Sequence, residues 1–144
     1  YTMTYNHPTP DAGEYSFYLQ NTSTSLVLVT SAIVVNATNI ARVKLWGVTG
    51  TAADGVARVP KNENLSSAND AAASTALHDG GGTTISGLST SGIEIKDASV
   101  VANGHVRLEL KDTVRLGQND AVALEMDTGT STPTIFGEVE FFFE

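Results

Sequence analysis

Residues 104–126, GHVRLELKDTVRLGQNDAVALEM, decide the fold class of this chain. Large apolar residues occupy every second position in two runs, 106–111 and 121–126, and a Gly-Gln-Asn-Asp turn at 117–120 separates them. A side-chain period of two is typical of a β-strand with one buried face and one solvated face. Gly, Asn and Asp tolerate the positive φ that tight turns need. The stretch therefore predicts two β-strands joined by a turn.

Similar runs recur along most of the chain. They cover residues 15–20, 26–35, 42–45, 93–96 and 135–143. Turn-forming pairs such as Asp54-Gly55 and Asn103-Gly104 lie between some of them. Short strands at close intervals indicate an all-β sandwich or barrel. Because 144 residues suggest one domain, we predict a single β-sandwich of jelly-roll type over residues 15–144.

Two segments lack this period. Residues 1–14, YTMTYNHPTPDAGE, carry two prolines and predict an extended N-terminal arm that is disordered in the free protein. Residues 61–92 are small, polar and glycine-rich, and they predict one long insertion loop on the surface. Within that loop, residues 68–77 are compatible with a helical turn and Ile85 with a short strand.

The composition argues against several classes of function. Eight basic and sixteen acidic residues give a net charge of −8, which disfavours nucleic acid as a partner because like charges repel. The chain has no cysteine and no apolar run of ~20 residues, so we expect neither a disulfide nor a membrane span. Only 17% of the residues are charged, below the usual ~25%. Depletion of charge is typical of protein–protein interfaces.

The string Asp127-Thr128-Gly129-Thr130 matches the D-T-G-[ST] motif of aspartic proteases. Those enzymes need two carboxyl groups that share one proton. The residues after Thr130 predict one turn and one strand, which cannot supply the rest of a protease lobe. We therefore interpret the string as a turn between the last two strands.

Other motifs with chemical associations are incomplete. Residues 78–82, HDGGG, resemble an oxyanion loop of esterases, but no G-x-S-x-G nucleophile elbow accompanies them, so we interpret them as a flexible loop tip. The three histidines have no zinc-site spacing, and residues 62–70 lack a calcium-loop pattern. We predict a non-enzymatic protein with no catalytic residue, metal or cofactor.

From Trp46 to the C-terminus, a series of short motifs resembles a family of tailed-phage virion proteins. In order, the motifs are Gly47-Val48-Thr49-Gly50, a G-x-x-x-V-P-x-N segment at 55–62, Thr84-Ile85-Ser86-Gly87-Leu88, Leu108-Glu109-Leu110, LGQND at 116–120, Val122-Ala123-Leu124-Glu125 and the aromatic strand 139–143. Together they span about two-thirds of the chain. The resemblance implies a small β-sandwich on the virion surface that decorates the capsid as a cement protein. Its implied partners are the major capsid protein or other virion proteins.

Apolar residues on the outer faces of strands predict contacts with other subunits. Phe136 and Phe142 fall on the polar face of the last run, and Val27 and Val29 lie opposite Leu26 and Leu28. A strand that is apolar on both faces is covered on both faces, either by another subunit or by the insertion loop. We expect a homo-oligomer, and analogy with virion surface proteins favours a trimer. The candidate interface residues are Tyr1, Met3, Tyr5, Val27, Val29, Trp46, Phe136 and Phe142.

Two alternative functions remain open at this stage. Trp46 shares a predicted strand face with Arg42 and Lys44, so a carbohydrate-binding module or adhesin could use it as an aromatic platform. Its other interpretation is a strand-end residue that caps the sandwich core. A fibre or pilus subunit that donates its arm as a strand to the next subunit is the third reading.

Overall fold

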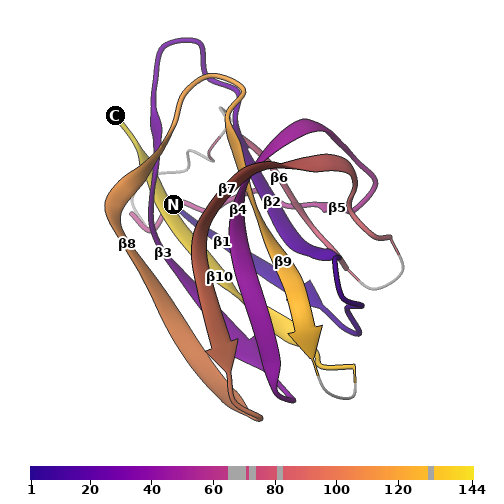
Figure 1. Ribbon diagram of the computed structural model, residues 1–144. Helices are drawn as coiled ribbons and strands as arrows, with labels where there is room; N and C mark the ends of the chain where they lie inside the picture. The colour runs from indigo at the N-terminus through magenta and orange to yellow at the C-terminus, as the bar shows by residue number, and fades with distance from the viewer. Residues whose placement is uncertain (65–70, 72–73, 81–82, 130–131) are drawn as a thin grey trace.

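The computed structural model describes residues 1–64, 71, 74–80, 83–129 and 132–144, and over these ranges the protein is all-β (Figure 1). The strands are β1 (Thr2–His7), β2 (Tyr15–Asn21), β3 (Leu28–Ala37), β4 (Ala41–Ala53), β5 (Val56–Ala57), β6 (Ser74–His78), β7 (Ser86–Val100), β8 (Gly104–Leu116), β9 (Ala121–Gly129) and β10 (Ile135–Phe143). They form two packed antiparallel sheets. The prediction of an all-β sandwich is confirmed.

The two sheets differ in size. The smaller has four strands in the order β1-β10-β3-β8, and the larger has six in the order β5-β6-β2-β9-β4-β7. The deciding stretch, 104–126, forms β8 and β9 as its alternation predicts. These strands do not pair with each other, because β8 lies at the edge of the smaller sheet and β9 lies inside the larger one. The predicted turn at 117–120 therefore carries the chain from one sheet to the other.

The core lies between the sheets and takes every second residue of most strands. In β9, Val122, Leu124 and Met126 are buried, and in β10, Ile135 and Val139 face them from the other layer. The remaining strands contribute further large side chains, among them Phe17, Leu19, Leu28, Ile33, Val35, Val43, Leu45, Leu110 and Phe141. Because both layers present apolar side chains at the same period, one continuous core forms.

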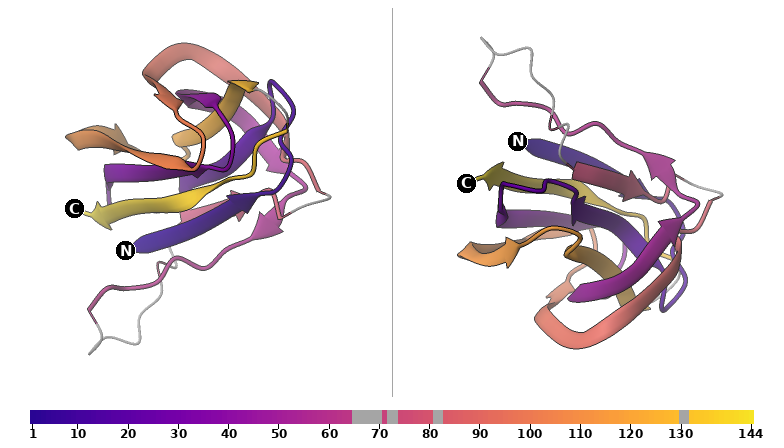
Figure 2. Two further views of the ribbon diagram at one scale, coloured as in Figure 1. Left: turned by 90° about the horizontal axis from the view of Figure 1, so that it is seen from below. Right: turned by 90° about the horizontal axis from the view of Figure 1, so that it is seen from above.

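The N-terminal segment is a core strand, so the prediction of a disordered arm is wrong. β1 pairs with β10, with Met3 opposite Val139 and Tyr5 opposite Gly137. Met3 is 1% exposed and Tyr5 is 2% exposed. Figure 2 shows β1 and β10 side by side, with both termini at the same end. The alternation in this segment was too short to recognise beside the two prolines that follow it.

A glycine makes room for the buried tyrosine of β1. The Tyr5 hydroxyl donates a 2.9 Å hydrogen bond to the carbonyl oxygen of Val34 on β3, one strand beyond β10. The side chain reaches that carbonyl past Gly137, where an added Cβ would lie 2.9 Å from the Tyr5 hydroxyl and 1.9 Å from the Val34 oxygen. A glycine inside a strand often marks such a close approach. Gly137 thus lets Tyr5 lock β1 onto the sheet.

The predicted insertion loop is also largely incorrect where the structure describes it. Residues 74–78 form β6, which pairs with β2, and β7 begins at Ser86. The predicted helical turn at 68–77 is replaced by strand over 74–77, and its residues 68–70, 72 and 73 lie outside the described residues. The predicted short strand near Ile85 corresponds to the start of β7. Small side chains such as Ser, Thr and Ala conceal these strands because they carry little hydrophobic contrast.

The position of β1 in the core gives a direct test. Replacing Tyr5 with alanine removes a fully buried ring, so the free energy of unfolding should fall by about 3–5 kcal/mol in urea denaturation at neutral pH. Thr4→Ala is the matched control, because Thr4 is exposed on the same strand and should change stability by no more than about 0.5 kcal/mol. If the two variants are equally stable, Tyr5 is not part of the core and the segment is a free arm.

Candidate functional site

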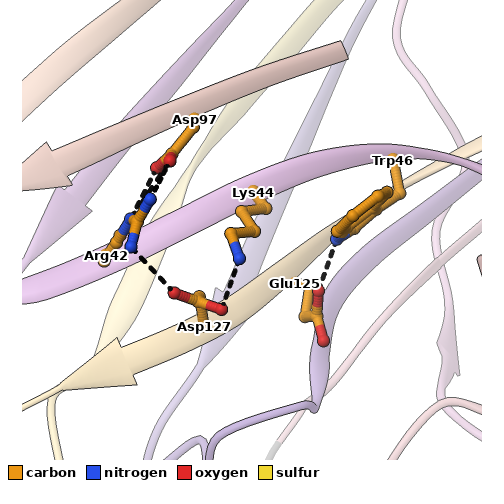
Figure 3. A network of polar contacts seen from close by, with 6 residues as sticks. All are labelled: Arg42, Lys44, Trp46, Asp97, Glu125 and Asp127. Carbon is orange, nitrogen blue, oxygen red and sulfur yellow. Dashed lines mark hydrogen bonds and ion pairs between the residues drawn. The ribbon is translucent and has the colours of Figure 1, made fainter. Parts of the chain in front are cut away.

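A row of charged side chains lies on the outer face of the six-stranded sheet (Figure 3). Alternate residues of β4 point into the core, so Arg42 and Lys44 point outward. Asp97 on β7 and Asp127 on β9 approach them from the two neighbouring strands. The strand alternation therefore places two cations between two carboxylates.

The four side chains form a connected network. The Nζ of Lys44 lies 2.7 Å from Oδ1 of Asp127, and Nη1 of Arg42 lies 3.6 Å from Oδ2 of the same carboxylate. The Arg42 guanidinium also donates to both carboxylate oxygens of Asp97, with Nε 2.9 Å from Oδ1. Cross-strand charge pairs on a solvated sheet face add modest stability and hold the side chains in place.

These contacts keep the network charged over a wide range of pH. The hydrogen bond from Arg42 lowers the pKa of Asp97, and the hydrogen bond to Asp97 raises the pKa of Arg42. The hydrogen bond to Asp127 raises the pKa of Lys44. Each shift favours the charged form, so Arg42, Lys44 and Asp97 stay charged near neutral pH.

Trp46 continues this row along β4. Its Nε1–H donates a hydrogen bond to the carboxylate of Glu125, and Nζ of Lys44 lies 5.9 Å from the centre of its ring. Part of the ring packs on a small second apolar cluster that includes Tyr18 and Ala123. The predicted shared face with Lys44 is confirmed, whereas the interpretation of Trp46 as a cap on the sandwich core is wrong.

The D-T-G string lies in a strand rather than in a turn. Asp127 to Gly129 are the last residues of β9, so the predicted turn at these positions is wrong, and Thr130 lies outside the described residues. The Asp127 carboxylate is held by Lys44 and Arg42. Aspartic protease chemistry needs a carboxyl group that shares its proton with a second one. A carboxylate paired with two cations does not have that arrangement.

A second polar cluster is buried where β1 and β6 meet. His7 lies with its Nδ1 3.2 Å from Oγ of Ser16, and its Nε2 is 3.2 Å from Oδ2 of Asp79 and 3.4 Å from Oε2 of Glu14. His78, at the end of β6, adds a second buried imidazole. The interpretation of residues 78–82 as a flexible loop tip is therefore wrong for His78 and Asp79, and residues 81 and 82 lie outside the described residues.

The order Ser16, His7, Asp79 resembles a nucleophile, base and acid, but its geometry does not suit acyl transfer. Ser16 is 0% exposed, so its hydroxyl cannot reach a substrate. Sequence reasoning missed the cluster because its members come from distant parts of the chain and no short motif contains them. Their shared signal would have been polar residues at inward positions of strands.

The structure divides the eight candidate interface residues into two groups. Met3, Tyr5 and Val29 are buried within the chain itself, so their assignment to an interface is wrong. Tyr1, Val27, Trp46 and Phe142 are partly buried, and Phe136 is 41% exposed. The ring of Tyr1 stacks on Phe141 with the centroids 5.7 Å apart, which explains its partial burial.

Phe136 and Phe142 share the outer face of the four-stranded sheet, but they do not form one patch. Glu138 and Glu140 lie between them on the same face of β10. Arg107 of β8 reaches across β3 to Glu140, with Nη1 2.7 Å from Oε1. An ion pair therefore separates the two phenylalanines.

Three exposed apolar side chains lie instead near the end of the sandwich opposite the C-terminus, which we call the distal end. It comprises the connections 38–40, 101–103 and 132–134 and the first residues of β10. Ile40 is 55% exposed, Val101 is 69% exposed and Phe136 is 41% exposed. At this end of the larger sheet, Ala41 of β4 pairs with Val100 of β7. Ile40 precedes Ala41 and Val101 follows Val100, and Phe136 lies next to the first residue of β10. Figure 1 shows the three connections together at the bottom of the molecule.

The distal end is tied together by hydrogen bonds and carries no formal charge. Thr38 accepts at its carbonyl from the Asn103 N–H at 3.3 Å and donates its own N–H to the Thr134 carbonyl at 3.1 Å. Residues 36–41, 98–106 and 128–137 contain no Asp, Glu, Lys or Arg. Ile40 and Val101 escaped the sequence analysis because single apolar residues beside a turn have no periodicity.

Within the described ranges, no group of three or more His, Asp or Glu side chains is arranged to hold a metal ion. The same part of the chain contains no helix with the length and apolar character needed to cross a membrane.

No protein-family model, no curated protein and no solved structure matches this chain. The class of the protein is therefore defined by its architecture, a two-layer antiparallel β-sandwich.

The environment of Trp46 predicts a measurable structural role. Trp46→Ala removes a partly buried ring and should lower the free energy of unfolding by about 2 kcal/mol, measured by urea denaturation followed by circular dichroism. Trp46→Phe keeps most of the apolar contact and loses the hydrogen bond to Glu125, so it should cost about 1 kcal/mol. If the alanine variant matches the wild type, the ring contributes nothing to the outer cluster.

Proposed function

We propose that this chain is a non-enzymatic structural protein of a virus particle, which attaches to the capsid or another virion protein and stabilises that surface by contact. The resemblance of its motif order to tailed-phage virion proteins supports the proposal. The compact sandwich supports it as well, because such a domain presents a rigid surface. The observation that carries the proposal is the distal end, where three exposed apolar side chains lie in or beside connections that contain no charged residue.

The physical argument concerns the cost of leaving the distal end in water. Single exposed apolar residues are ordinary on a protein surface, but several at one end of a domain favour burial against a partner. The chain has 24 charged residues, eight basic and sixteen acidic, and none lies in the three segments that meet here. Burial of Ile40, Val101 and Phe136 would contribute roughly 1.5–3 kcal/mol for each fully covered side chain.

The partner surface would be apolar and uncharged at its centre. A stable complex buries about 800 Å² on each partner, more than three side chains supply, so the contact would extend over the neighbouring polar residues. In this proposal the protein also forms a homo-oligomer, with a trimer as the stoichiometry carried by the family resemblance. Phe142 and Val27, partly buried on the outer face of the smaller sheet, are available for that second contact.

The first test asks where the protein is found. Virus particles purified from cultures that produce this chain should contain it in a fixed ratio to the major capsid protein, as measured by quantitative mass spectrometry. Cryo-electron microscopy of the same particles should place its distal end against another virion protein. Particles without the chain, or with the distal end facing solvent, would contradict the proposal.

The second test concerns the side chains. Val101→Ser with Phe136→Ser should weaken co-sedimentation of the labelled protein with those particles by about tenfold to hundredfold for each buried residue. Ile93→Ser is the matched control, because Ile93 is 63% exposed on β7 outside the distal end. Light scattering separates the two contacts, since a variant that keeps its oligomeric mass but loses particle binding has lost the partner surface alone. Unchanged particle binding would exclude the distal end.

A second candidate function is carbohydrate binding at the outer face of the six-stranded sheet. The specific observation is Trp46, a partly exposed ring with Lys44 and Glu125 held beside it. An aromatic ring with fixed charged groups around it can stack on a sugar and bond its hydroxyls. Glycan-array binding that is abolished in Trp46→Ala and retained in the distal-end variant would favour this function over docking. The absence of binding by the wild type would remove it.

A further inference from the structure

β1 is an edge strand that pairs with β10 on one side only, and two contacts with residues 61 and 78 close its other side. At one end, Thr2 and Lys61 exchange backbone hydrogen bonds of 2.9 Å. At the other end, the backbone of Asn6 meets the side chain of His78 on β6, with the Asn6 nitrogen 3.2 Å and the Asn6 carbonyl oxygen 3.1 Å from Nδ1. Because β1 belongs to the smaller sheet and β6 to the larger one, His78 joins the two layers.

The joint is buried, and only one of the ring nitrogens of His78 has a hydrogen-bond partner among the described residues. His78 is 2% exposed, and its Nε2 has no hydrogen-bond partner among the described residues. When the imidazole is neutral with its proton on Nε2, Nδ1 accepts the Asn6 N–H. Protonation adds an N–H at Nδ1, which can donate to the Asn6 carbonyl but takes the acceptor away from the Asn6 N–H. It also places a charge on a buried ring whose Nε2–H has no acceptor among the described residues. The buried charge and the lost acceptor oppose the contact.

His7 supports the same joint from β1. Its ring connects Ser16 of β2 with Asp79, which follows β6, and the Asp79 N–H donates to the Ser16 carbonyl at 3.3 Å. A neutral ring can accept from the Ser16 hydroxyl at Nδ1 and donate from Nε2 to Asp79. The segments that meet at this edge are thus bridged by two imidazoles.

The charged groups around the two rings shift the histidine pKa values in opposite directions, and burial has the largest effect on both. Burial is the largest influence on His78 and lowers its pKa, aided by Arg58 and His7 and opposed by the Asn6 carbonyl and Asp79. Burial is also the largest influence on His7 and lowers its pKa, against Asp79, Glu14 and Asp11. Both imidazoles are therefore neutral at pH 7.

We propose that His78 forms an acid-sensitive latch that holds β1 against β6 while its imidazole is neutral and releases this edge of the sandwich when it is protonated. The sign follows from proton binding. An unfolded or opened histidine titrates at its ordinary pKa of 6.5, whereas the closed state titrates lower. The open state then binds more protons as the pH falls below 6.5, so closure is complete above that pH and weakens below it.

The experiment measures amide hydrogen exchange in the intact wild-type chain at pH 7.5 and pH 5.5, corrected for the intrinsic exchange rate. A histidine that titrates at 6.5 when open and stays neutral when closed weakens closure by at most about tenfold at pH 5.5. We expect protection of the Asn6 and Asp79 amides to fall by a factor approaching that limit. Amides in the β3–β10 pair should keep their protection. Unchanged protection at Asn6, or an equal loss in every strand, would overturn the latch.

Variants assign the effect to particular rings. His78→Asn offers an oxygen near the position of Nδ1 and cannot titrate, so the loss of protection at pH 5.5 should become smaller or vanish. His105→Asn is the matched control, because His105 is exposed on β8 and its replacement should leave the wild-type response intact. Full retention of the response in His78→Asn would overturn the role of His78. If that variant does not fold, the site-resolved exchange of the wild type decides the question.

Discussion

The structure depends on one constraint, which is that each layer of the sandwich must present large apolar side chains to the other at every second position. Leu124 at the centre of the larger sheet and Val139 in the smaller one meet this constraint from opposite sides. The same period sends Arg42, Lys44 and Arg107 outward, where Arg42 and Lys44 pair with carboxylates on neighbouring strands and Arg107 reaches across β3 to Glu140. The division between core and surface is therefore a direct consequence of strand geometry.

The surfaces that this constraint leaves exposed differ in character. The outer face of the larger sheet carries a network of paired charges around Trp46, and that of the smaller sheet carries the Arg107–Glu140 pair. The distal end has neither charge nor cover for its apolar side chains. In the proposed docking mode, a partner at the distal end would cover these side chains, whereas a contact centred on either sheet face would have to desolvate an ion pair.

The closure of the β1 edge lies close to that surface. Asn6, whose backbone meets His78, is the register partner of Phe136. A change in the pairing of β1 would therefore be felt beside an exposed residue of the distal end. Ser16, which His7 contacts, is buried, so this arrangement does not suit acyl transfer. His78 lies at the joint between the layers, where the proposed latch would control the edge.

The sequence by itself determined the fold class and most of the strands. Alternation in runs such as Val106-Leu110 and Val122-Met126 is strong enough to survive any tertiary context, because a slip of one residue would expose the whole apolar set. It also placed Trp46 beside Lys44 correctly. The weakly patterned segments were misjudged, since Met3 and Tyr5 belong to a core strand and residues 74–78 to β6.

Only the tertiary structure decided which strands pair and which distant residues meet. Two strands joined by the turn at 117–120 went to different sheets, because each found its partners elsewhere in the chain. The grouping of His7 with His78, and of Ile40 with Val101 and Phe136, depends on those pairings. The alternation of apolar and polar residues shows which face of a strand is buried, but it contains no information about which strand lies beside it.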